Sequence, residues 1–120
     1  MNIIFASREE AAELTARYIM LELDTFQVQE HGKRISWCVL DPASVPMTEL
    51  WCIDDLRQKH GEALYHYQQA DWDRCLQALS ELRGHWAGQV DSFYTALEHR
   101  IHDLQEQELP EHWDGTLLHS

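Results

Sequence analysis

Apolar residues in the second half of the chain recur every three or four positions, the spacing that lines one face of an α-helix. Within 62–82 this pattern is interrupted by a turn at Ala70-Asp71, so we expect two antiparallel helices with Asp71 as the N-cap of the second. The apolar positions are Leu50, Ile53, Leu56, Ala63, Leu64 and Tyr67 before the turn, and Trp72, Cys75, Leu76, Leu79, Leu82 and Trp86 after it.

The same period continues after this helical pair. The first helix of the pair should begin with Thr48 as its cap and run to about Gln69, and a third helix should start near Asp91 or Ser92 and end near Gln105. Its apolar face comprises Val90, Phe93, Tyr94, Leu97, Ile101 and Leu104. The pattern therefore predicts a three-helix antiparallel array over residues 48–105.

The first 46 residues follow a different pattern. A short apolar run, 2–6, predicts a strand, and Ser7-Arg8-Glu9-Glu10 is a capping box that predicts a helix start. The segment 20–29 alternates like a strand, with a change of phase at Asp24-Thr25 that predicts a bulge there or a helix extending to about Met20. A turn at 30–33 and a returning strand at 34–40 predict a hairpin.

Two prolines, Pro42 and Pro46, separate these two patterns. We therefore predict an α+β fold in which a small antiparallel sheet with one helix (1–46) precedes the helical array (48–105). A tail, 106–120, should dock onto the helices through Trp113. The front has too few residues to fold alone, so we expect a single domain over 1–120.

Part of the helical pattern resembles known families. Ala63, Tyr67, Asp71-Trp72, Cys75 and Leu79 are similar to one tetratricopeptide hairpin, although Ala87 stands where its closing proline would be. A longer set resembles the C-terminal helical tail of some bacterial class III nucleotide cyclases, whose catalytic domain has no counterpart here: Tyr67, Asp71-Trp72, Leu79, Leu82, Tyr94, Arg100 and 109–115. These resemblances imply a bacterial protein with a helical interaction module, and they bring no catalytic residues.

Charge and cysteine content narrow the function. The 120 residues carry a net charge of −12, which repels nucleic acid and anionic membranes, and no apolar run approaches the ~20 residues needed to span a bilayer. Cys38, Cys52 and Cys75 form no CxxC pair and lie in apolar surroundings. We interpret them as buried reduced thiols and expect a cytoplasmic protein.

The eight histidines raise the question of a metal site. His99 and His102 lie three residues apart on one predicted helix, where two imidazoles could share an ion. A metal site needs three or four ligands, and the spacing supplies two, so we interpret both as surface residues and expect no metal or other cofactor. No Walker, GxGxxG or GxSxG motif is present, and Cys75 falls on the core face of its helix.

Aromatic residues are the remaining functional signal. Interfaces favour Tyr and Trp, and Tyr65, Trp86 and Trp113 are the candidates for surface anchors. Our leading hypothesis is a non-catalytic module that binds a protein partner or associates with itself. One alternative is a ligand-binding or enzymatic pocket between sheet and helices, lined by Trp37, Tyr67 and His66. Another is a regulatory fragment that acts on a signalling enzyme.

Overall fold

The computed structural model describes residues 2–28, 32–109 and 113–119, and it confirms the α+β class. The strands are β1 (Asn2–Phe5), β2 (Ile19–Val28), β3 (Gly32–Leu40) and β4 (Leu117–His119). The α-helices are α1 (Arg8–Leu14), α2 (Met47–Leu50), α3 (Ile53–Gln68), α4 (Trp72–Leu82) and α5 (Asp91–Gln105). Short 3-10 turns occupy Pro42–Ser44 and Trp86–Gly88.

The sheet has the order β1-β3-β2-β4, in which β1 and β2 both pair antiparallel with β3. The register between β2 and β3 shifts between Glu22 and Thr25, so the predicted bulge is confirmed. The first helix ends at Leu14 and not near Met20, which resolves the alternative that the alternating pattern left open.

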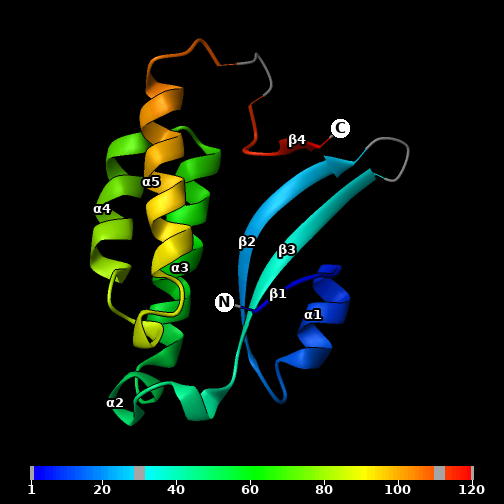
Figure 1. Ribbon diagram of the computed structural model, residues 1–120, viewed down its shortest axis with the longest axis vertical. Coiled ribbons are helices and arrows are strands. Elements are labelled where there is room, and N and C mark those ends of the chain that lie inside the picture. The colour runs from blue at the N-terminus through cyan, green and yellow to red at the C-terminus, as the bar shows by residue number, and fades with distance from the viewer. Residues whose placement is uncertain (1, 29–31, 110–112, 120) are drawn as a thin grey trace.

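Alternation along the strands gives the sheet two apolar faces. Leu21 and Cys38 are opposite each other and join the core formed with the helices. Met20 and Trp37 point the other way and form a second, smaller cluster with Ala11 of α1. Figure 1 shows the result: α3, α4 and α5 form a layer on one side of the strands, and α1 lies on the other.

The three long helices pack around a common core, which the helical period predicted. Its fully buried side chains include Trp86, Tyr94, Leu79, Leu82, Leu97 and Ile101. None of the helices in the described part of the chain is long and apolar enough to cross a bilayer.

The predicted start of the first long helix is wrong. Thr48 is not a cap, because α2 begins at Met47 directly after Pro46, and a break at Trp51 and Cys52 separates α2 from α3. The α2 segment is instead held by Glu49, whose carboxylate accepts a hydrogen bond from the Trp86 backbone N–H at 2.6 Å. This contact joins residues 37 positions apart, so helical periodicity could not reveal it.

The predicted start of α4 is confirmed, because Asp71 is its N-cap residue, but the Asp71 side chain makes no capping hydrogen bond. Its carboxylate lies 3.5 Å from the Arg74 guanidinium instead. The cysteine prediction also needs one correction, since Cys38 and Cys75 are buried whereas Cys52, in the helix break, is exposed.

The tail folds back over the helices and reaches the sheet. Trp113 packs edge-on against Tyr67 and Trp72, and its indole N–H donates to the Tyr67 carbonyl at 3.2 Å. Beyond it, β4 pairs in parallel with the hairpin end of β2, which the sequence did not predict. Between Trp113 and β4, Gly115 has a φ of 82° and lies against the Tyr67 ring.

Candidate functional site

A chain of buried polar groups crosses the core. The Trp86 indole N–H donates to the Tyr94 hydroxyl at 3.1 Å, and that hydroxyl lies 3.0 Å from His60 Nδ1. His60 Nε2 lies 2.5 Å from the Glu22 carbonyl, which can only accept, so Nε2 carries the proton and Nδ1 accepts from Tyr94. Every polar group of this chain has a partner, and it links α3, α5 and β2.

Burial sets the protonation of this chain. It lowers the pKa of His60, against the effect of the hydrogen bond to the Glu22 carbonyl, and thus keeps the imidazole neutral. Burial also raises the pKa of the Tyr94 hydroxyl. A neutral, fully paired and buried His–Tyr–Trp chain stabilises the core, and we assign it no catalytic role.

A second polar contact fixes the bulge in β2. Arg100 of α5 donates to the Asp24 carboxylate at 2.8 Å, and its guanidinium lies 5.9 Å from the centre of the Tyr67 ring. Burial lowers the pKa of Arg100, but the stronger combined effect of Asp24 and Tyr67 leaves it raised. We interpret this ion pair as structural too, because it joins the sheet to the helical layer.

The structure separates the three predicted anchor residues. Tyr65 is 57% exposed on α3. Trp86 is fully buried, so it presents no surface to a partner, and Trp113 is half-buried against Tyr67 and Trp72. Aromatic residues at such turns and tails look alike in sequence whether they close a core or face solvent.

The metal and pocket candidates are also dispersed. His99 and His102 are both exposed on α5, and the described residues contain no group of three His, Cys, Asp or Glu side chains placed to hold a metal. Trp37 lies on the α1 side of the sheet, whereas Tyr67 belongs to the helical core. His66 packs against the ring of Tyr65. The structure therefore does not bring Trp37, Tyr67 and His66 together, although Trp37 lines a hollow between the sheet and α3.

The sheet has an open edge at β1. The Ala6 N–H donates to the Ile35 carbonyl at 3.1 Å, which makes Ala6 and, by alternation, Ile4 and Asn2 the residues that bond to β3. The backbone N–H and C=O groups of Ile3 and Phe5 therefore point away from β3. Within the described chain no strand lies beyond β1 to receive them.

The same two residues carry exposed apolar side chains. Ile3 is 49% and Phe5 64% exposed, on the sheet face that also carries Cys38 but beyond the reach of the helices. Phe5 packs against Phe26 with ring centres 6.0 Å apart, and both line a hollow of about 440 Å³ with Val28 and Arg34. We call Ile3, Phe5, Phe26 and Val28 the β1 patch.

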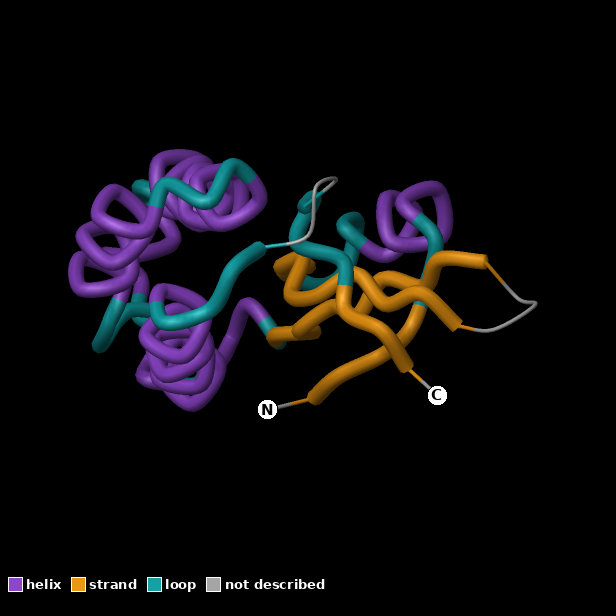
Figure 2. Tube along the Cα trace, turned by 90° about the horizontal axis from the view of Figure 1, so that it is seen from above, coloured by secondary structure: helices purple, strands orange, loops and turns teal. Residues whose placement is uncertain are grey.

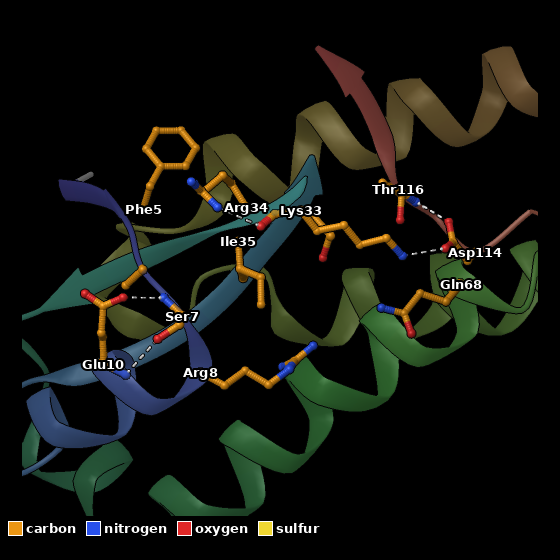
Figure 3. Close-up of a pocket in the computed structure, with 12 residues that line it drawn as sticks. Phe5, Ser7, Arg8, Glu10, Lys33, Arg34, Ile35, Gln68, Asp114 and Thr116 are labelled. Carbon is orange, nitrogen blue, oxygen red and sulfur yellow. Dashed lines mark hydrogen bonds and ion pairs between the residues drawn. The ribbon is translucent and has the colours of Figure 1, made fainter. Parts of the chain in front are cut away.

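A larger groove of about 780 Å³ lies where β1 leads into α1, and it extends to the tail. Figure 3 shows its wall: the Ser7–Glu10 capping box, Arg8, the hairpin residue Lys33, Gln68 of α3 and Asp114 of the tail. The capping box is confirmed, with Ser7 Oγ accepting from the Glu10 N–H at 3.1 Å and Glu10 accepting from the Ser7 N–H at 3.2 Å.

A second hollow of about 300 Å³ continues from this groove along α3, because Arg8 and Gln68 line both. Trp37 and Met20 form part of its wall, and Gly61 of α3 faces it. A Cβ at Gly61 would meet no atom within 4 Å, so packing within the protein does not require glycine there. Glycine in a helix costs about 1 kcal/mol relative to alanine.

One further exposed apolar pair lies far from both features. Trp51, at 79% exposure, and Met47 lie at the break between α2 and α3, at the opposite end of the molecule from the hairpin (Figure 1).

Sequence reasoning missed the β1 patch, although a signal was present. The run Asn2 to Ala6 is apolar without alternation, which is typical of a strand covered on both faces. The structure covers one face with α1 and leaves Ile3 and Phe5 of the other uncovered.

Comparison with known proteins adds no assignment to these surfaces: no family model, no curated protein and no solved structure matches the chain.

Proposed function

We propose that this protein is a non-catalytic interaction module that binds an extended segment of another protein as an added strand on β1. The observation that carries the proposal is that two features of β1 occur at the same two residues. Ile3 and Phe5 direct their backbone groups to the open sheet edge, and the same residues expose large apolar side chains. An edge of this kind is a template for strand addition, in which main-chain hydrogen bonds supply affinity and neighbouring hollows supply specificity.

The chemistry of the partner segment follows from the surface. Apolar side chains on one face of the added strand would cover Ile3 and Phe5, and one could fill the hollow lined by Phe26 and Val28. Arg34 also lines this hollow, so an acidic residue in the segment would find a complementary charge. We therefore specify an extended segment with alternating apolar residues and a carboxylate.

Charge favours a different protein over a second copy. Each chain carries −12, and two copies joined edge to edge would repel one another. The same charge supports the absence of nucleic acid and anionic membranes from the partners. The three free cysteines support a reducing compartment such as the cytoplasm. In this proposal the helical layer is the scaffold that holds the β1 edge in place. Its resemblance to a tetratricopeptide hairpin belongs to the same proposal.

Selection from a random 12-residue peptide display library tests the proposal. Wild-type protein should enrich peptides with alternating apolar residues, and Phe5→Lys should weaken the selected peptides by about tenfold or more, since loss of an aromatic anchor costs ~1.4 kcal/mol or more. Bound peptide should also slow hydrogen exchange at the Ile3 and Phe5 amides. Trp51→Lys is the matched control, because it places the same charge on an exposed aromatic far from β1.

Equal binding by the Phe5→Lys protein, or protection confined to other amides, would overturn the proposal. Failure to enrich any peptide would do the same. Light scattering is run in parallel, and a dimer with protected Ile3 and Phe5 amides would assign the edge to a second copy instead.

A further inference from the structure

Basic residues are concentrated around the groove between α1 and the tail, although the chain as a whole is acidic. The protein has 9 basic and 21 acidic residues. Arg8, Lys33 and Arg34 line this one groove, together with two carboxylates, those of Glu10 and Asp114. One third of the basic residues therefore surround a single hollow.

The polar groups come from segments far apart in the chain and share the hollow. Arg8 is supplied by the first turn of α1, Lys33 by the hairpin and Gln68 by the end of α3 (Figure 3). The Lys33 ammonium is 81 residues from its partner Asp114, so the tertiary fold alone places it here. Thr25 and Ile35 of the sheet also line the groove, and they add one polar and one apolar side chain.

The two ion pairs at these cations differ in exposure. Lys33 lies 3.2 Å from Asp114, and both side chains are 56% exposed. Exposed ion pairs contribute about 0–1 kcal/mol, so an anion entering the groove could take the place of Asp114 at small cost. Arg8 is 65% exposed but pairs with Glu22, whose side chain is only 17% exposed, so an anion would share the Arg8 guanidinium with Glu22 and not displace it.

We propose that this groove binds a small phosphate- or carboxylate-bearing molecule, with Arg8 and Lys33 as its anion contacts and Gln68 as a neutral hydrogen-bond partner. The volume of about 780 Å³ is in the range of small-molecule sites. A guanidinium can donate two hydrogen bonds to two oxygens of a phosphate or carboxylate, and an ammonium adds a point charge beside it. The groove shares Phe5 and Arg34 with the hollow beside β1, but anion binding uses Arg8 and Lys33, whereas strand addition uses the backbone of Ile3 and Phe5.

The tail gives this site an internal competitor. One carboxylate oxygen of Asp114 accepts a hydrogen bond from the Lys33 ammonium, and the other accepts from the Thr116 N–H at 2.9 Å. The Thr116 and Lys33 contacts hold the pKa of Asp114 at about 2, so the carboxylate is charged throughout the neutral range. The Asp114→Asn variant keeps an oxygen for Thr116 but loses the charge, so it should release Lys33 and increase anion affinity.

Isothermal titration of the full chain at low ionic strength tests the site with two probes, pyrophosphate for the phosphate source and citrate for the carboxylate source. We expect wild type to bind at least one probe, and binding should weaken as salt is added. Lys33→Met and Arg8→Gln should each weaken it by about tenfold or more. Asp114→Asn should strengthen it.

Lys59→Met is the matched control. Lys59 pairs with Glu81 at 2.7 Å between α3 and α4, so this variant makes the same charge change at a site away from the groove. Amide NMR shifts should map to Arg8, Lys33 and Gln68. Lack of binding by both probes, equal weakening in Lys59→Met, or shifts confined to other residues would each overturn the proposal.

Discussion

The helical layer and the hairpin end of the sheet hide their apolar side chains to very different degrees. In the layer, Leu97 and Tyr94 are fully buried and the polar groups of the His60 chain are paired. At the hairpin end, Phe5 is exposed and open hollows lie on the sheet. Figure 2 shows this separation, with the three long helices gathered on one side and the strands extending away from them beside the short helix α1. The comparison indicates that the helical layer supplies stability and that the hairpin end is free to supply binding.

Truncation of one apolar side chain in each region should give the largest contrast. Leu97→Ala removes a fully buried side chain and should lower the free energy of unfolding by about 2–5 kcal/mol. Phe5→Ala should change it by about 0.5 kcal/mol or less, since its ring is mostly in water. Urea unfolding followed by tryptophan fluorescence measures both. Similar losses for the two variants would mean that β1 contributes to the main core.

The tail is the bridge between the two regions, and Gly115 is its critical residue. Gly115→Ala places a Cβ 3.2 Å from the Tyr67 ring at a φ of 82°, which should cost about 1–3 kcal/mol and release Trp113. Gly32→Ala is the control, because it has a φ of 75° but meets nothing within 4 Å. Unfolding free energies should show the smaller loss for Gly32→Ala, and equal losses would argue against the contact with Tyr67.

The His60 chain should make the helical layer sensitive to acid. The fold lowers the pKa of His60 below its ordinary value of 6.5, so below that pH the unfolded chain binds a proton that the folded chain does not. Stability due to this group is present above pH 6.5 and is lost as the pH falls toward the lowered pKa of His60, so the protein should be less stable at pH 5.5 than at pH 7.5. Urea unfolding at both pH values measures it.

The control for this effect is a pair of substitutions. His60→Gln should be less stable than wild type at both pH values but should show a smaller difference between them. His99→Gln, at an exposed position on α5, should retain the wild-type pH dependence. An unchanged dependence in His60→Gln would show that His60 is not the responsible group.

Local patterns predicted much of the fold because local interactions dictate it. Positions such as Leu79 and Leu97 recur with the helical turn, and Ser7 and Glu10 cap a helix three residues apart, so both signals lie within one turn. The bulge was readable because a phase change at Asp24-Thr25 reverses which side chains face the core. The candidate sites were harder to predict from the sequence. Tyr65 was predicted to be exposed and is, whereas Trp86 closes the core and Trp113 anchors the tail.

By itself the sequence determined the order of the first three strands and the long helices, the proline boundary and the amphipathic faces, since each depends on neighbours within a few residues. The tertiary structure alone decided which faces remain uncovered. The Asp24–Arg100 pair joins residues 76 apart and the Lys33–Asp114 pair joins residues 81 apart. Such contacts set the position of the tail, the open edge of β1 and the walls of the groove, and no periodicity along the chain encodes them because their partners are distant in sequence.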